Sequence, residues 1–284
     1  MRETMAFQPG QETSSPLSQA ISAQDRDTMA MVRLAIERKW VKMAYQMVVS
    51  APSPDRPAFC ESLLRVLDHK GRVIPARDFI PIVKEDKMGR ELDVLALEIG
   101  LDMLNQYPSL RLSINLSARS IGYFPWKKTL LDRLQGNRTM AERLILEISE
   151  EATYTIPELV QVFMEEMQML GISFALDHFG RGFTSLRHLR DLYFDIIKID
   201  KTYTRDLASN PDNQAMTKAI VAMAHSLETY VVAQNVENGD DARILTELGV
   251  DGMQGFYFGA PTLEPFWMQE GMSCQVGQGG ALRA

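Results

Sequence analysis

Short strand-like runs alternate with longer amphipathic stretches over most of this chain. Six of the runs lie at residues 112–115, 144–148, 172–177, 196–200, 230–234 and 251–255. Consecutive apolar positions with β-branched side chains are typical of strands that are buried on both faces of a parallel sheet. Two earlier runs, at residues 41–49 and 60–68, bring the number of predicted strands to eight.

The stretches between the runs have the spacing of helices with one buried face. One stripe with i, i+3, i+4, i+7 and i+11 spacing consists of Leu92, Leu95, Ala96, Ile99 and Met103. A second helix is predicted from Pro157, which suits the first helical position, to the residue before Gly171, which suits the end. Further helices are predicted around residues 216–227 and 245–248. Strands and helices therefore alternate along the chain.

An α/β chain with eight strands separated by helices predicts a barrel of the (β/α)8 type. The length of 284 residues suits one such domain, which we expect over residues 25–270. Residues 1–24 are rich in Ser, Gln, Thr and Pro, and they are predicted to be disordered. Residues 271–284 are rich in glycine and are predicted to form a flexible tail.

Each of the six later runs ends at or near a polar side chain. These side chains are Asn115, Glu147, Asp177, Lys198, Gln234 and Gln254. In a (β/α) barrel the carboxyl ends of the strands meet at one rim, where active sites are built. We therefore expect these side chains to converge, together with Glu61 and with Glu237, which follows the run at 230–234.

The chemistry of this set points to a cation and a phosphate. Glu61, Asn115, Glu147 and Asp177 offer only oxygen ligands, which suit Mg²⁺, Mn²⁺ or Ca²⁺. Lys198 and Arg65 add positive charge, which together with a metal ion would neutralise a phosphodiester and polarise a water. Each residue alone is more often structural, but Glu147 and Lys198 are charges inside apolar runs, and such charges are rarely buried without a partner.

The overall composition excludes several classes of protein. The net charge is −7 and no basic stripe is visible, so binding to duplex nucleic acid is not expected. The two cysteines have no metal-binding spacing and indicate reduced thiols of a cytoplasmic protein. No apolar run is long enough to span a bilayer.

Several segments resemble the EAL domain family of cyclic di-GMP phosphodiesterases, over about residues 32–267. The matching segments are CESLLR at 60–65, LSINLSARS at 112–120, LILEISE at 144–150, DHFGRGFTSL at 177–186, IIKID at 196–200, AQNVE at 233–237 and QGFYFGAP at 254–261. The resemblance implies a modified TIM (β/α)8 barrel that often dimerises.

The resemblance also implies a role for each matching residue. The metal ligands would be Glu61, Asn115, Glu147 and Asp177. Lys198 and Glu237 would be catalytic residues: Lys198 would help position the attacking water, and Glu237 would lie near the metals. The ligand would be bound by Arg65, Gln46, Gln254 and Phe256, with Arg65 on a phosphate. Glu150 would anchor the loop that contains Phe179 and Gly180.

Two departures from the family pattern affect one half of the site. His178 stands where the family has a second Asp, and Gln234 stands where the family has the Glu proposed as general base. Glutamine carries no charge and cannot accept a proton at neutral pH. One divalent cation is therefore expected to bind, whereas the second metal site is expected to be lost. Asn235, Met47 and Ser62 also replace family residues.

These departures leave three functions open. The first is a receptor that binds cyclic di-GMP with lost or strongly reduced hydrolysis, acting through a homodimer or a downstream protein partner. The second is a metal-dependent cyclic di-GMP phosphodiesterase, a phosphodiester hydrolase, that remains active. The third is a protein-interaction module that no longer binds the dinucleotide. We expect the receptor, because both changes fall at the same metal site.

Overall fold

The computed structural model of the chain describes residues 16–83, 86–182 and 186–268. Residues 1–15 of the predicted disordered segment, and all of the predicted tail at 271–284, lie outside the described residues. Helix α1 (Pro16–Glu37) begins inside the segment predicted to be disordered. No helix in the described part of the chain is long and apolar enough to cross a membrane.

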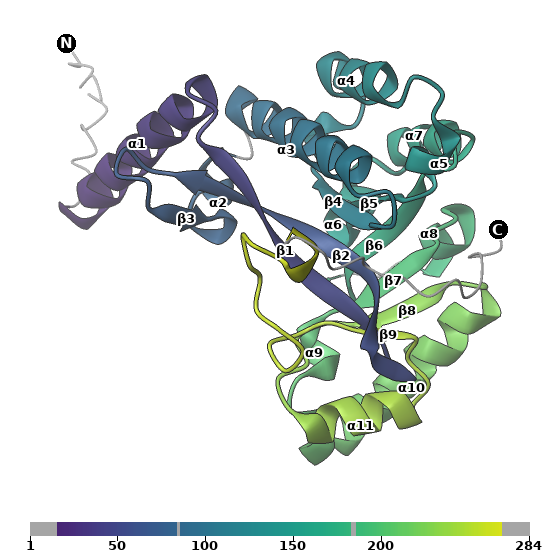
Figure 1. The fold of residues 1–284 in the computed structure, drawn as a ribbon. Coiled ribbons are helices and arrows are strands. Elements are labelled where there is room, and N and C mark those ends of the chain that lie inside the picture. The colour runs from purple at the N-terminus through teal and green to yellow at the C-terminus, as the bar shows by residue number, and fades with distance from the viewer. Residues whose placement is uncertain (1–15, 84–85, 183–185, 269–284) are drawn as a thin grey trace, which may run out of the picture.

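Eight strands close into a barrel, which confirms the predicted fold (Figure 1). They are β1 (Val41–Ser50), β2 (Ser53–Leu67), β4 (Leu112–Leu116), β5 (Leu144–Ser149), β6 (Ser173–Phe179), β7 (Ile196–Ile199), β8 (Tyr230–Ala233) and β9 (Gly252–Met253). Neighbours from β2 through β4 to β9 are parallel, while β1 is antiparallel to both β2 and β9. This reversed strand is the modification of the (β/α)8 pattern. The short β3 (Val73–Pro75) pairs with the end of β2 outside the ring.

Helices cover the outside of the ring, and the predicted stripes lie on them. The longer ones are α3 (Lys87–Gln106), α4 (Phe124–Leu134), α7 (Pro157–Gln168), α10 (Pro211–Ser226) and α11 (Gly239–Glu247). The shorter ones are α2 (Ile80–Val83), α5 (Arg138–Ala141), α6 (Glu150–Thr155), α8 (Leu186–Asp191) and α9 (Lys201–Thr204). Short 3-10 turns lie at η1 (Ala76–Asp78), η2 (Ala118–Ser120), η3 (Leu207–Ser209) and η4 (Phe266–Met268). Pro157 starts α7 as predicted.

The interior of the barrel is an apolar layer. Its buried members are Val48, Phe59, Ile145, Ala175, Ile196 and Val232. Because side chains alternate between the two faces of a strand, the residues two positions further along each strand point into the barrel as well. A much larger core fills the space between the sheet and the surrounding helices. The apolar layer thus forms a floor beneath the next inward-facing residues of the strands.

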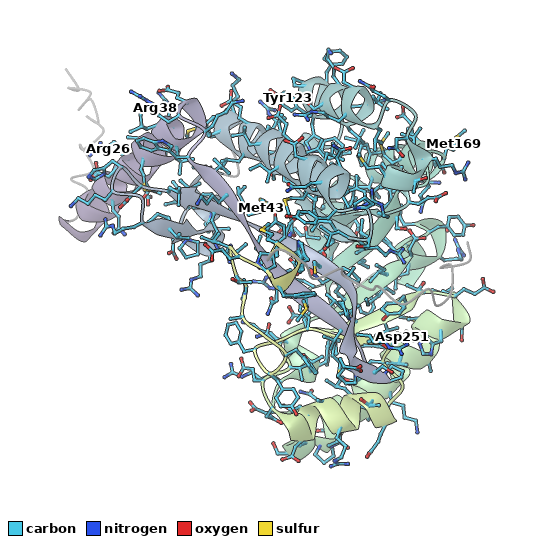
Figure 2. The ribbon with its side chains drawn as sticks, viewed as in Figure 1. Arg26, Arg38, Met43, Tyr123, Met169 and Asp251 are labelled. Atoms are coloured by element: carbon cyan, nitrogen blue, oxygen red, sulfur yellow. The ribbon has the colours of Figure 1, made fainter. Side chains whose placement is uncertain are left out.

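A second, smaller core lies beside the barrel. Helices α1 and α2 and strand β3 gather on the extended ends of β1 and β2, where Figure 2 labels Arg26 on α1 and Arg38 just after it (Figures 1 and 2). Three residues are buried together there: Val32 from α1, Phe79 directly after η1, and Leu92 from α3. Helix α3 continues into the main core through Leu97 and Leu104, so this helix belongs to both cores.

Candidate functional site

The inward-facing residues directly above the apolar floor form a ring of polar side chains. They are Gln46, Glu61, Asn115, Glu147, Asp177, Lys198, Gln234 and Gln254. Six of these polar residues stand two positions from a floor residue, as Lys198 does from Ile196. Five hydrogen bonds link six of the side chains, and a sixth joins Gln234 to Asp177. The predicted convergence of these residues at one end of the barrel is therefore present in the structure.

Lys198 lies at the centre of this ring. Its side chain is 0% exposed, and its Nζ donates to Oε2 of Glu61 at 2.8 Å and to Oε2 of Glu147 at 2.7 Å. Oδ1 of Asp177 lies 3.8 Å from the same nitrogen. The ammonium group therefore occupies the space between three carboxylates, which is where the family resemblance led us to expect a metal ion.

The pKa values of the central groups are shifted by burial and by each other. Burial alone would lower the pKa of Lys198, but the three carboxylates raise it above its usual value. Burial would raise the pKa of Glu61, but the charge and hydrogen bond of Lys198, together with the hydrogen bonds from Gln254 and Asn115, hold it below its usual value. Burial and the charge of Glu61 raise the pKa of Glu147 to about 8. Of the two glutamates that Lys198 contacts, Glu147 is thus the one that is more readily protonated.

Amide side chains donate to both carboxylate oxygens of Glu61. Asn115 Nδ2 donates to Oε1 at 3.1 Å, and Gln254 Nε2 donates to Oε2 at 2.7 Å. Gln254 Nε2 also lies 3.4 Å from Oε1 of Gln46, whose own Nε2 donates to the carbonyl of Gly259. A continuous polar chain therefore links β1, β9 and β2.

Asp177 is held by the two residues that depart from the family pattern. Gln234 Nε2 donates to its Oδ1 at 2.7 Å, and His178 Nε2 lies 3.2 Å from its Oδ2. The other ring nitrogen of His178 lies 3.1 Å from Oδ2 of Asp200. The imidazole thus bridges two carboxylates, and an amide and a ring nitrogen contact Asp177 where the family has two carboxylates.

The backbone at these departures has a left-handed conformation. His178 has φ +58°, at an irregularity in the pairing of β6 with β7, and Asn235 has φ +57°. Non-glycine residues adopt this region rarely, with Asn, Asp and His several-fold enriched. Asparagine at position 235, where the family has glycine, therefore keeps the turn after β8 with little strain.

The donor set retains some capacity to hold a cation. Oε1 of Glu147 and Oε1 of Gln234 are buried and have no hydrogen-bond partner among the described residues. Oxygen ligands of this kind suit a hard divalent ion. However, no group of three or more His, Cys, Asp or Glu side chains in the described ranges is arranged to hold a metal ion. In this structure the ammonium group of Lys198 lies between the carboxylates.

The remaining predicted residues lie around the ring. Arg65 is half-buried, and its Nη1 donates to the carbonyl of its neighbour Leu64; burial and nearby Arg77 lower its pKa. Glu237 was expected to converge with the ring, but it is exposed and none of the described contacts joins it to the ring, because it lies three positions beyond Gln234 in the turn after β8. The Phe256 side chain is 68% exposed. Glu150 is buried and its Oε2 accepts from the backbone of Gly182, in the loop that follows Gly180.

Two residues near the site were not predicted from the sequence. Asp200 lies at the end of the same run as Lys198 and binds His178, while its Oδ1 caps α9 through the backbone N–H of Thr202. Thr204 donates through its hydroxyl group to the backbone carbonyl of Gln234. The charge of Asp200 in an apolar run was a usable signal, but its partner became visible only with the fold.

Comparisons with known proteins agree with this architecture. A family model described as the EAL domain matches residues 29–261. The signalling protein YkoW of Bacillus subtilis is 28% identical over 81% of this chain and 29% of its own length. Cyclic di-GMP phosphodiesterase PdeR of Escherichia coli is 29% identical over 81% of this chain and 35% of its own length. The chain thus spans about a third of the length of these relatives.

Solved structures give the same result. The chain resembles a structure described as the PaMucR phosphodiesterase in complex with c-di-GMP, with a TM-score of 0.73 and 27% identity over 83% of this chain and 97% of that one. An EAL domain protein from Listeria monocytogenes has a TM-score of 0.74 at 27% identity, over 82% of this chain and 93% of that one.

Proposed function

This chain belongs to the EAL domain family, and on that premise we propose that it binds cyclic di-GMP as a signalling receptor, with hydrolysis lost or strongly reduced. Relatives named as cyclic di-GMP phosphodiesterases, and a similar structure named as a c-di-GMP complex, support the choice of ligand. The receptor would pass its signal through a second copy of the chain or through a protein partner.

The observation that carries the proposal is the hydrogen bond from Gln234 to Asp177. The amide nitrogen of Gln234 lies 2.7 Å from Oδ1 of Asp177 and is a hydrogen-bond donor. The family resemblance implies that catalysis needs an anionic oxygen and a base at this position. His178 supplies a second nitrogen against the same carboxylate. Loss of a general base alone lowers a rate by about 10²–10⁴-fold, and the loss of a metal that activates water lowers it further.

Binding needs fewer of these groups than hydrolysis does. Glu61, Asn115, Glu147 and Asp177 would hold one divalent cation, which when bound supplies counter-charge to a phosphate oxygen and lowers the pKa of a bound water. Arg65 would neutralise a phosphate, and Gln46 and Gln254 would orient the ligand from β1 and β9. Lys198 holds the carboxylates together when no cation is bound, and its side chain would have to move aside when one binds.

Calorimetry with cyclic di-GMP tests binding, in EDTA and separately with Mn²⁺ or Mg²⁺. We expect heat of binding with the wild type and a clear loss of affinity with Arg65→Ala. The absence of heat at high protein concentration in every condition would reject the receptor and favour an interaction module.

Chromatography of the nucleotide after long incubation tests hydrolysis. We expect intact dinucleotide with the wild type, and linear product with the double variant His178→Asp/Gln234→Glu in Mn²⁺. The matched control adds Glu61→Ala to the double variant, which should abolish the restored activity.

An active phosphodiesterase is the second candidate. The unpartnered Oε1 of Glu147 favours it, because a buried oxygen of this kind can bind an ion. Turnover by the wild type in Mn²⁺ that disappears in Glu61→Ala would establish this candidate in place of the receptor.

A further inference from the structure

Asp93 on α3 holds the loop that follows the Asn115 strand. Its Oδ2 accepts hydrogen bonds from the hydroxyl of Ser117 at 2.5 Å, the hydroxyl of Ser120 at 2.6 Å and the backbone N–H of Ser117 at 3.3 Å. Burial raises the pKa of Asp93, and the serine donors partly offset this effect. One carboxylate oxygen therefore fixes both ends of the turn η2.

Helix α3 holds the far end of the same loop as well. The guanidinium of Arg90, one turn before Asp93, lies 5.0 Å from the ring centroid of Tyr123. Tyr123 is the N-cap of α4, and it is labelled near the top of Figure 2. The loop from Ser117 to Tyr123 is thus attached to α3 at its beginning and at its end.

The support itself is rigid. Leu92, on one side of Asp93, is buried in the small core, and Leu97 is buried in the main core, both with 0% exposure. A helix that is packed into two cores is a precise platform, because its side chains cannot shift without disturbing both.

The loop begins close to Asn115. Asn115 is the exposed next-to-last residue of β4, two positions before Ser117, and its side chain lies 3.1 Å from Oε1 of Glu61. A strand end with an exposed polar residue has few packing contacts to fix its direction, and the bonds from Ser117 to Asp93 add a constraint at this end.

We propose that Asp93 is a positioning residue for Asn115: by holding Ser117 and Ser120 from α3, it aims the Asn115 amide at Glu61 and at the bound ligand. The role of Asn115 in binding rests on the proposed function, but its orientation in the free protein does not. Groups that orient a ligating side chain typically change affinity by about 10–100-fold when removed.

The test compares Asp93→Ala with a matched control, Asp68→Ala. Asp68 is also an aspartate that accepts three hydrogen bonds, from the backbone of Lys70 and from the backbone and side chain of Arg72, but it does so in the β2–β3 turn. Both variants lose a similar set of bonds, so a purely structural role predicts similar effects on the melting temperature and no difference at Asn115.

The first readout needs no ligand. The side-chain amide resonance of Asn115, assigned by its disappearance in Asn115→Ala, should shift or broaden in Asp93→Ala and stay in place in Asp68→Ala. Asp93→Asn, which keeps an acceptor oxygen, should lie between the wild type and Asp93→Ala. A resonance unmoved in Asp93→Ala would overturn the inference, whatever the ligand data show.

The second readout is the affinity for cyclic di-GMP with Mn²⁺. We expect Asp93→Ala to bind about 10–100-fold more weakly and Asp93→Ala/Asn115→Ala to bind no more weakly than Asn115→Ala, because both changes remove the same contact. If Asn115→Ala weakens binding and Asp93→Ala does not, the positioning role is wrong. If neither the wild type nor any variant binds, the proposed function fails, and the resonance of Asn115 still decides the role of Asp93.

Discussion

Replacing Lys198 with methionine tests how much the buried ammonium group stabilises the barrel. Methionine keeps a flexible, unbranched apolar side chain, so the change mainly removes the charge. Nζ lies 2.8 Å from Glu61 and 2.7 Å from Glu147, with no exposure to solvent. Each charge-assisted hydrogen bond contributes about 1.5–3 kcal/mol, and breaking a buried ion pair costs about 3–5 kcal/mol. We expect the free energy of unfolding to fall by about 3–5 kcal/mol at pH 9.

Urea unfolding followed by circular dichroism measures this loss. With a slope of about 3 kcal/mol per M, the midpoint should fall by more than about 1 M. The loss should be smaller at pH 6, because Glu147, with its pKa raised to about 8, is then protonated and leaves less uncompensated charge. The double variant Lys198→Met/Glu147→Gln is the control, and it should recover part of the stability at pH 9.

A midpoint for Lys198→Met close to that of the wild type at pH 9 would refute this reasoning. So would a double variant less stable than Lys198→Met at pH 9, since the removal of one carboxylate should then relieve repulsion.

Three further outcomes follow from single contacts. Arg143→Met should lower the free energy of unfolding by about 2–3 kcal/mol in urea titrations, because the guanidinium donates to four backbone carbonyls around the ends of α3 and α5. Between pH 5 and pH 8 the wild type should lose stability relative to Glu147→Gln, since the raised pKa of Glu147 keeps a proton in the folded state that the unfolded chain releases; equal slopes of midpoint against pH would contradict this. Gly255→Ala should lower the melting temperature strongly, because its Cβ would lie 2.0 Å from the carbonyl oxygen of Val236, whereas Gly182→Ala, with 3.5 Å to its nearest atom, should change it little.

The strands and the polar ring could be predicted because the sequence carries both signals locally. A charged residue inside an apolar run, such as Glu147 or Lys198, has to face a shared interior, and the alternation of side chains then brings such residues together. The hydrogen-bond and ion-pair partners inside the ring could not be predicted from the sequence. Which carboxylates Lys198 binds depends on the stagger of strands that are 51 and 137 residues away along the chain.

The direction of β1 could have been predicted. Parallel neighbours need a crossover of a dozen or more residues, but only residues 50–59 lie between the runs predicted at 41–49 and 60–68. An antiparallel hairpin follows from that length alone. The helix α1 and the small core were harder to predict, because a segment rich in Ser and Gln has little apolar periodicity and becomes ordered through partners such as Phe79 and Leu92, which are distant in sequence.

His178 and Gln234 are best understood as one change in the electrostatics of the site. With carboxylates at both positions, Asp177 would face two like charges within about hydrogen-bonding distance, and only a cation could hold them together. With a donating amide at 2.7 Å and an imidazole nitrogen at 3.2 Å, Asp177 is contacted by nitrogens of the chain itself. Lys198 does the same for Glu61 and Glu147. The charges of the ring are therefore offset by donors from the chain itself, and this is the physical basis on which we propose binding of a dinucleotide without its cleavage.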